Sequence, residues 1–291
     1  MSNEALATLT FAFGAVAYTA SLVLFFSEMV RPGKPLPGRR FAPWLLGLGG
    51  ALHLGSITLA AFVAHVCPVE SVHFALSVAS LVTVFGYLVA RVRFRIDLVG
   101  AFVAPVGLTF LLSTRFLALG PAQAKLPPLF LTLHVAANVV GDALFLLACV
   151  TAGLYLFAER RLKEKRVTAV LGRLPPLDAL DAAEHRFLLV GFPLLTLGII
   201  SGTAWSHKLE SGTSGELLRA AFAYLTWLVF AGVLLLRAVA GWRGRRAAVG
   251  TLVGFFFAVL VLVVYLVRPE PSPLSQAAPT TLSAPGSQTG R

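Results

Sequence analysis

Charged residues are scarce in this chain of 291 residues, where Asp, Glu, Lys and Arg together make up only 13%. A soluble domain carries roughly 25% charged residues. Apolar runs recur along the chain instead, and the mean hydropathy is +0.82. Because a helix of about 20 apolar residues crosses the hydrocarbon core of a bilayer, the sequence predicts an all-α, polytopic membrane protein.

Cysteine is also scarce, with only Cys67 and Cys149, which lie in different parts of the chain. There is no CxxC, no CxxCH and no cysteine spacing typical of a metal site, which argues against a thioredoxin-type carrier and against covalently attached c-type haem. P-loop, GxGxxG, HExxH and GxSxG motifs are missing as well. We therefore interpret both cysteines as small apolar packing residues.

Eight apolar segments can be drawn, and we expect each to form a transmembrane helix. They are Ala5–Phe26, Pro43–Val66, Phe74–Ala90, Leu98–Leu112, Leu129–Phe157, Phe187–Ala204, Ala220–Ala240 and Val249–Val267. The fourth is short and contains Pro105 and Gly107, so we expect a tilt or a kink there. The sequence thus predicts a membrane domain over 1–267. The tail over 268–291 is rich in Pro, Ser and Thr, cannot bury a core, and is expected to be disordered.

Basic residues cluster in four loops, and this clustering predicts the topology. The loops after the first, third, fifth and seventh segments, counted with Arg237 at the end of the seventh segment, hold 18 of the 24 Lys and Arg residues. Because basic loops stay in the cytoplasm, we expect a multi-pass protein of the bacterial cytoplasmic membrane with both termini on the outer side. The same clustering explains the net charge of +11 without a nucleic acid as partner. In the third of these loops, LPPLDALDAAEHRF over 174–187 predicts a short interfacial helix on the cytoplasmic side.

Histidines are the candidate functional residues of this chain. With the expected topology, one histidine, His53, lies within the membrane, and one, His185, is cytoplasmic. The other four lie at or near the outer face: His65, His73, His134 and His207. Imidazole near a bilayer boundary can ligate the iron of a b-type haem. An interfacial histidine is also often only an amphipathic side chain whose polar end contacts water. Both interpretations, haem ligand and solvated side chain, stay open.

His134 stands out because of the polar residues that follow it. Asn138 and Asp142 come at i+4 and i+8, which places a polar stripe on one face of a transmembrane helix. Ionisable groups within a membrane are costly and usually face a cavity or a partner. Since His53 and Asp142 are expected at similar depths, we hypothesise a contact between them.

The stretches around these residues resemble a known family, the CcsA/ResC and HemX-like cytochrome c assembly proteins, which are polytopic membrane proteins that handle haem. The resemblance runs from the second to the eighth apolar segment. It is carried by LHVAANVVGDALFLLACVTAGLYLFAERRLKEK, RLPPLDALDAAEHRFLLVGFPLLTLGIISGTAW and GWRGRRAA. In the first of these stretches His134 takes the place of the family's outer haem-ligand histidine. His53, in GGALHLGSI, resembles an intramembrane histidine of an early helix.

The chain departs from that family between Trp205 and Trp227. Members that deliver haem have a tryptophan-rich loop that ends in a WDPKE-like run, whereas this chain has KLESGTSGELLRAAF without a tryptophan. Tryptophan offers a porphyrin flat aromatic faces that exclude water, which Ser, Gly and Thr do not. The family's second outer histidine, eight residues past Trp227, is replaced here by Leu235. His207 is the candidate substitute, and its alternative interpretation is a solvated loop residue.

The resemblance implies a haem-handling component of cytochrome c biogenesis that binds haem b without a covalent bond. His134 and His53 would be the iron ligands, and His207, Trp205 and Trp227 would lie near the cofactor. The implied partners are an apocytochrome c or another cytochrome c assembly membrane protein, within the lipid bilayer. The altered loop indicates an accessory or haem-delivery protein rather than a complete cytochrome c synthase.

Two other functions stay open from the sequence. One is a HemX-like, haem-free membrane regulator or scaffold of tetrapyrrole metabolism, which the missing tryptophan motif favours. The other is a small-molecule transporter, for which Pro105 and Gly107 would mark a broken helix, although no second half of the chain carries a matching break.

Overall fold

The computed structural model describes residues 3–30, 38–64, 72–116, 128–164, 175–206 and 214–267. Within these ranges the chain forms eight α-helices, two short 3-10 helices and no strand. The helices are α1 (Asn3–Val30), η1 (Arg39–Phe41), α2 (Ala42–Ala64), α3 (Val72–Phe94), η3 (Asp97–Val99), α4 (Gly100–Phe116), α5 (Pro128–Lys163), α6 (Leu177–Ser206), α7 (Ser214–Val239) and α8 (Arg245–Leu266). Seven of the described helices are long and apolar enough to cross a bilayer, and a shorter apolar helical stretch covers Asp97–Leu112. The predicted all-α, polytopic architecture is confirmed. The tail over 268–291 lies outside the described residues.

The predicted apolar segments coincide with the eight helices, and the differences lie at their ends. One of them concerns α5, which has 36 residues where roughly 20 cross the hydrocarbon core. Its last turns carry two ion pairs between residues four apart, Lys163 with Glu159 at 2.7 Å and Arg160 with Glu164 at 3.0 Å. Such i,i+4 pairs support a helix in water, so α5 continues beyond its apolar part.

The connection between α3 and α4 is tight and polar. Arg95 follows α3 with a φ of 53°, in the left-handed region that glycine usually occupies at a helix end. Arg91 pairs with Asp97 of η3, and the Tyr87 hydroxyl donates to the Asp97 carbonyl oxygen at 3.0 Å. These contacts turn the chain directly into α4, which has 17 residues with Pro105 inside it.

The interfacial helix predicted over 174–187 is not a separate element. Its residues form the first turns of α6, which runs without a break from Leu177 to Ser206. The predicted helix start after Pro175 and Pro176 is confirmed. The prediction of a separate element was wrong because no helix breaker follows those prolines until Pro193. In addition, two of the acidic residues of these turns, Asp181 and Glu184, contact neighbouring helices rather than water.

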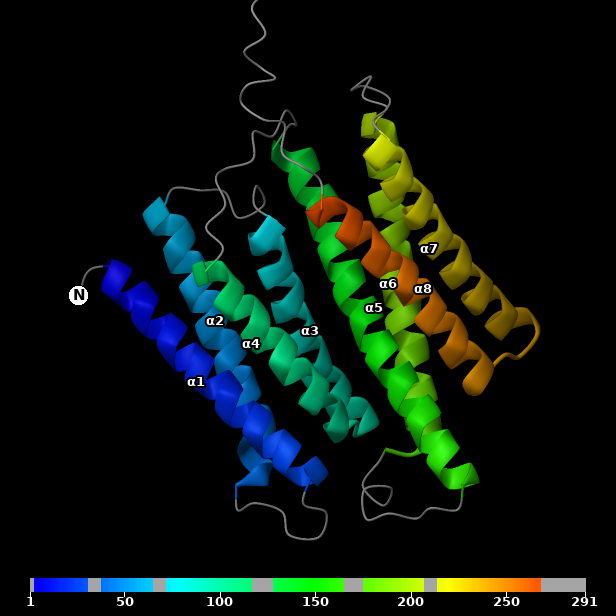
Figure 1. The fold of residues 1–291 in the computed structure, drawn as a ribbon, viewed down its shortest axis with the longest axis horizontal. Helices are drawn as coiled ribbons and strands as arrows, with labels where there is room; N and C mark the ends of the chain where they lie inside the picture. The colour runs from blue at the N-terminus through cyan, green and yellow to red at the C-terminus, as the bar shows by residue number, and fades with distance from the viewer. Residues whose placement is uncertain are drawn as a thin grey trace, which may run out of the picture.

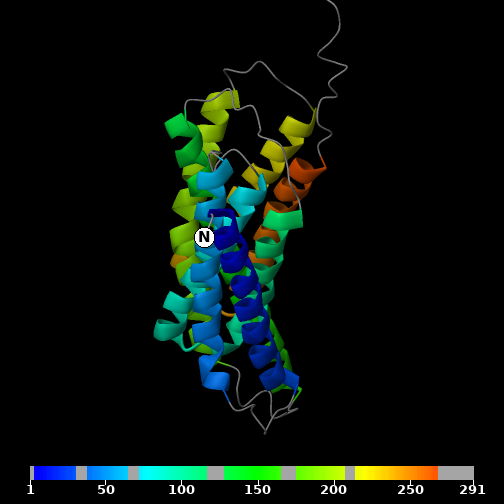
Figure 2. The same cartoon turned by 90° about the vertical axis from the view of Figure 1, so that its left-hand side faces the viewer.

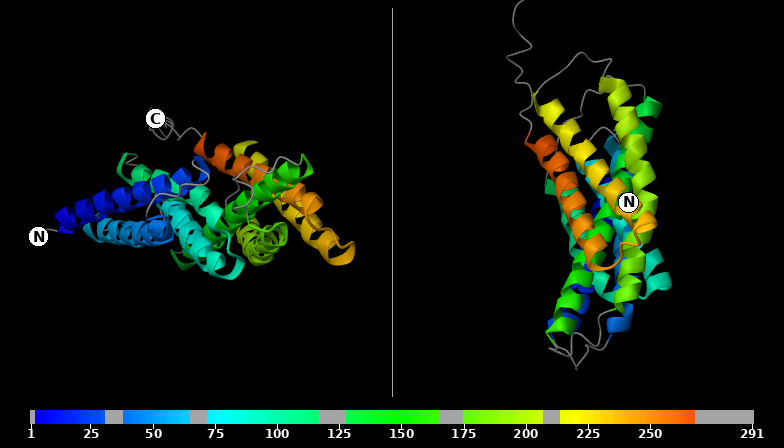
Figure 3. Two further views of the ribbon diagram at one scale, coloured as in Figure 1. Left: turned by 90° about the horizontal axis from the view of Figure 1, so that it is seen from below. Right: turned by 90° about the vertical axis from the view of Figure 1, so that its right-hand side faces the viewer.

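The helices form two groups that lie side by side (Figure 1). One group holds α1 to α4 and the other α5 to α8, and they join where α3 packs against α5 and α6. Seen from the side, the bundle is much narrower (Figure 2), and seen from below, α1 and α7 lie at its opposite ends (Figure 3). Large apolar side chains such as Trp44, Val89 and Val239 are exposed on its surface, as expected for helices that face lipid.

Close helix contacts in the first group depend on glycines around Tyr18 of α1. Tyr18 is fully buried. A Cβ built on Gly49 of α2 would lie 2.8 Å from its ring, and one built on Gly107 of α4 would lie 2.7 Å from it, so neither position has room for a side chain. Small residues let transmembrane helices approach closely, because the driving force between them is packing rather than water exclusion. In the second group Phe145 of α5 stacks on Phe230 of α7 with ring centroids 4.3 Å apart.

Candidate functional site

His134 lies one to two turns inside the start of α5 and contacts α6. Its Nδ1 is 2.7 Å from the Ser201 hydroxyl oxygen, and its Nε2 is 3.3 Å from the Asn138 side-chain nitrogen. Asn138 also donates from this nitrogen to the His134 carbonyl oxygen at 2.8 Å. The imidazole is half-buried, so its edge remains accessible from the surface of the bundle. Of the polar stripe predicted on α5, His134 and Asn138 are joined in this way, and α6 adds Ser201 to them.

The Ser201 hydroxyl fixes which imidazole nitrogen carries the proton. Its own hydrogen is directed at two carbonyl oxygens of α6, those of Leu197 at 2.7 Å and Gly198 at 3.0 Å. Ser201 therefore accepts a hydrogen bond from His134 Nδ1–H, which leaves a lone pair on Nε2. A metal-ligating histidine typically donates its other ring N–H to a neighbouring oxygen in this way. The residues present thus fit a metal ligand at His134 Nε2, as the haem implied by the resemblance would need.

Glycines of α6 make room for these two side chains. A Cβ built on Gly198 would overlap the Asn138 side chain, and one on Gly202 would lie 3.3 Å from the His134 ring. Gly198 and Gly202 form a GxxxG pair, the spacing that places small residues on one face of a helix. This pair, together with Ser201, was not predicted, although the GIISG sequence carries the signal.

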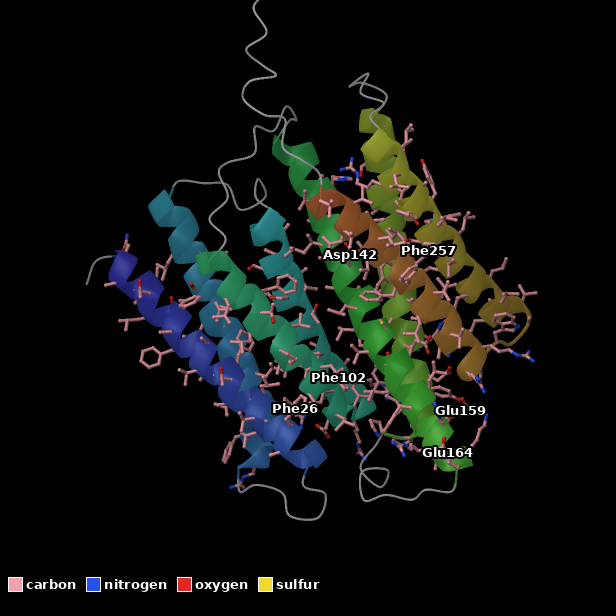
Figure 4. The ribbon with its side chains drawn as sticks, viewed as in Figure 1. Phe26, Phe102, Asp142, Glu159, Glu164 and Phe257 are labelled. Atoms are coloured by element: carbon pink, nitrogen blue, oxygen red, sulfur yellow. The ribbon has the colours of Figure 1, made fainter. Side chains whose placement is uncertain are left out.

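His53 is fully buried in the α1–α2–α4 group, away from His134. Its Nδ1 is 3.4 Å from the Tyr18 hydroxyl oxygen, and its Nε2 has no hydrogen-bond partner among the described residues. No hydrogen bond joins His53 to Asp142, the residue hypothesised to contact it, and Asp142 is exposed on α5. Figure 4 shows Asp142 well above Glu159 and Glu164, toward the His134 end of α5.

Trp227 connects α7 to α6. Its indole N–H donates to the Thr196 hydroxyl oxygen at 3.0 Å, and its ring packs on Phe192 with centroids 5.5 Å apart. Trp205 lies in the last turn of α6, and its side chain is outside the described part of the chain. His207 and His65 lie outside the described residues, as does the side chain of His73.

Replacing Trp227 with Phe separates a structural role from a cofactor role. The ring contact with Phe192 is kept and one hydrogen bond is lost, so we expect the free energy of unfolding to fall by about 1 kcal/mol. Detergent unfolding of the purified protein measures this change. A haem absorption band that disappears from an otherwise folded Trp227→Phe protein would show that the indole contacts the cofactor.

Leu235 is not at the same end of the bundle as His134. It lies one turn before the end of α7, next to Arg237, which contacts the beginning of α6. His134 contacts the end of α6 at Ser201. The interpretation of Leu235 as the position of a lost second ligand on the His134 side was therefore wrong, because α7 carries the chain to the opposite end before residue 235.

A buried polar cluster at that opposite end was missed from the sequence. Asp181 of α6 pairs with Arg237 of α7 and accepts a hydrogen bond from the Gly244 N–H at 2.8 Å. Thr251 of α8 donates to Glu184 of α6 at 2.5 Å. The cluster joins α6, α7 and α8 where these helices meet. The available signal was the pair of acidic residues three positions apart in DAAEH, which puts both on one helix face.

These features define a polytopic helical membrane protein with a histidine held between two of its helices. Residues 69–269 match the model of the cytochrome c assembly protein family. The chain belongs to this family, and the resemblance seen in the sequence is confirmed. The matched region contains α3 to α8, so His134 lies inside it and His53 lies outside it.

Individual relatives are cytochrome c biogenesis proteins named CcsA. The cytochrome c biogenesis protein CcsA of Heterosigma akashiwo is 28% identical over 237 residues, covering 68% of this chain and 72% of that protein. CcsA of Chlamydomonas reinhardtii is 27% identical over 199 residues, covering 65% and 55%. CcsA of Crocosphaera subtropica is 36% identical over 116 residues, which span 40% of this chain and only 34% of that relative. No solved structure matches.

Proposed function

We propose that this protein holds haem b without a covalent bond during cytochrome c assembly and passes it to an apocytochrome c or to another assembly protein. Membership of the family places the chain in cytochrome c biogenesis. The observation that carries the haem proposal is the 2.7 Å contact between His134 Nδ1 and Ser201. Bound haem would supply an iron that an imidazole can ligate and the vinyl groups that a c-type cytochrome attaches to its cysteines.

The residues of this chain contribute positioning rather than bond-making in the proposed mechanism. Ser201 keeps the proton on His134 Nδ1, and the α6 glycines set the distance between α5 and α6. Asn138 covers Nε2 at 3.3 Å and would turn aside when a ligand binds there. His53 is the second proposed ligand because its Nε2 is buried and unpartnered among the described residues. Its full burial means that haem reaches it only if the packing of α1, α2 and α4 opens.

The proposed site faces the outer side of a bacterial cytoplasmic membrane. The ends of α3, α5 and α7 carry Arg91 and Arg93, Arg160 to Lys163, and Arg237, all opposite to the His134 end. Because basic termini stay in the cytoplasm, this distribution supports an outward His134 and outward chain termini. Delivery to an apocytochrome c on that side follows from the same orientation.

Absorption spectra of the purified protein, oxidised and reduced, test the proposal. We expect a Soret band in the wild type and its loss in His134→Gly, with recovery when imidazole is added to that variant. Ser201→Ala should retain the ligand but weaken haem binding by about 10–100-fold, as loss of such an outer hydrogen bond typically does. His185→Ala, at the opposite end of α6, serves as the histidine control. A colourless wild type from haem-replete cells, or a His134→Gly variant with an unchanged spectrum, would refute the assignment.

The second candidate function is a haem-free membrane regulator or scaffold of tetrapyrrole metabolism. It is favoured by the absence of tryptophan between Trp205 and Trp227 and by the position of Asn138 against His134 Nε2. A colourless protein that co-purifies with an enzyme of tetrapyrrole synthesis supports this alternative.

A further inference from the structure

A groove of about 1190 Å³ runs between α3 and α6, with α2 and α5 contributing one residue each to its lining. This α3–α6 groove is separate from the His134 site, and none of the His134 contacts lines it. Its walls are apolar, with Leu81, Phe85, Val89, Leu144, Phe187 and Val190 among the lining residues. The volume exceeds the roughly 300–1,000 Å³ of ordinary small-molecule sites, which suits a ligand with long apolar chains.

Three arginines line the basic end of the α3–α6 groove. Arg93 and Arg95 lie where α3 ends, and Arg186 lies on α6 across from them. All three side chains are exposed, and none forms an ion pair with a described residue. Asp178 is the one acidic residue among the described lining residues, so the basic end keeps a net positive charge. Guanidinium groups match phosphate oxygens through paired N–H donors.

The conformation of Arg95 adds an independent observation. Its φ of 53° is costly for a residue with a Cβ, and glycine would fill this position without that cost. Strained residues of this kind concentrate at functional sites, where the side chain has a use that offsets the strain. A phosphate at the basic end of the α3–α6 groove would provide such a use.

The lining of the α3–α6 groove does not suit haem. Its described residues include no histidine, cysteine, methionine or tyrosine, the side chains that ligate haem iron. An amphipathic anion without a metal fits better. We infer that the α3–α6 groove binds an anionic phospholipid, with acyl chains along the apolar walls and the phosphate among Arg93, Arg95 and Arg186.

Native mass spectrometry of the full chain in mild detergent tests this assignment. The protein is mixed with equal amounts of phosphatidylglycerol and phosphatidylcholine that have the same acyl chains. Each arginine near the anionic headgroup of phosphatidylglycerol contributes a preference of about 5-fold over zwitterionic phosphatidylcholine, so the wild type should retain phosphatidylglycerol well above phosphatidylcholine. Arg95→Gly should reduce the ratio about 5-fold without lowering the melting temperature, because glycine suits the left-handed conformation. Arg93→Gln/Arg95→Gly/Arg186→Gln should bring it close to 1.

A matched control also removes three arginine charges from the basic end of the bundle, but from residues that do not line the groove. Arg160→Gln/Arg161→Gln/Arg245→Gln should keep the phosphatidylglycerol preference. Equal retention of both lipids by the wild type would overturn the assignment, as would an equal loss of preference in the control. A groove variant that keeps its lipid preference but loses a Soret band would assign the groove to haem instead. Because the lipid readout needs no haem, its failure is distinguishable from failure of the His134 proposal.

Discussion

Asp181→Ala should lower the free energy of unfolding by about 3–5 kcal/mol, the cost of leaving one partner of a buried ion pair unpaired. The side chains of Asp181 and Arg237 are only 15% and 8% exposed. Removing the carboxylate leaves the Arg237 guanidinium without its counter-charge, although its Nη2 still donates to the residue 181 carbonyl oxygen at 3.2 Å. Its Nη1 already has no partner among the described residues, and the Gly244 N–H loses its acceptor. Titration of the purified protein with a denaturing detergent, followed by tryptophan fluorescence, measures the change.

Two comparisons isolate the buried charge as the cause. Asp181→Ala/Arg237→Met removes both charges, so it should recover most of the lost stability. Glu164→Ala breaks an exposed pair with Arg160, whose side chain is 82% exposed, and should cost no more than about 0.5 kcal/mol. If the double variant is as unstable as Asp181→Ala, the explanation by an unpaired charge is wrong.

Gly198→Ala should destabilise the protein by about 1–3 kcal/mol, the usual effect of an extra methyl group in a close-packed interface. The new Cβ would overlap the Asn138 side chain, whose Nδ2 lies 3.0 Å from the Cβ position. Asn138 contacts His134, so we expect the same substitution to displace the imidazole and to reduce the haem that remains bound after purification. The same unfolding titration and the Soret absorbance per protein report the two effects.

Gly232→Ala in α7 is the matched control for Gly198→Ala. A Cβ at Gly232 meets nothing within 4 Å, so this substitution should raise stability by up to about 1 kcal/mol through helix propensity alone. Similar effects of the two substitutions would contradict the close contact between α5 and α6 at Asn138. A loss of stability in Gly198→Ala with unchanged haem content would separate the packing role from the cofactor role.

The helices could be predicted from the sequence because each apolar run is bounded by polar or basic residues. The end of α5 could not, since its last turns are held by charged pairs such as Lys163 with Glu159 rather than by apolar residues. The first turns of α6 were misassigned for a related reason. In the sequence, Asp181 and Glu184 are typical of an interfacial helix that faces water. Their partners are far away in the chain: Arg237 follows Asp181 by 56 positions, and Thr251 follows Glu184 by 67.

The candidate site could be predicted in part. His134 and Asn138 share one helix face, so their spacing alone brings them together. Ser201 requires the rotation of α6 relative to α5, which apolar periodicity does not specify. His53 forms no hydrogen bond with Asp142, since equal depth in a membrane says nothing about direction around the helix axis. His53 faces Tyr18 within its own helix group, and Asp142 is exposed.

The division into two helix groups has a consequence for how the chain is assembled during synthesis. The principal packing partners of α1, α2 and α4 all belong to the first group, so they have been translated by Phe116. These helices can therefore pair in the membrane while the ribosome is still making α5. Within the first group α3 must wait, because the face that meets α5 and α6 has no partner until α5, which begins at Pro128, has been inserted. That face is fully covered only when α6 follows. Until then, lipid or the insertion machinery must cover that face of α3.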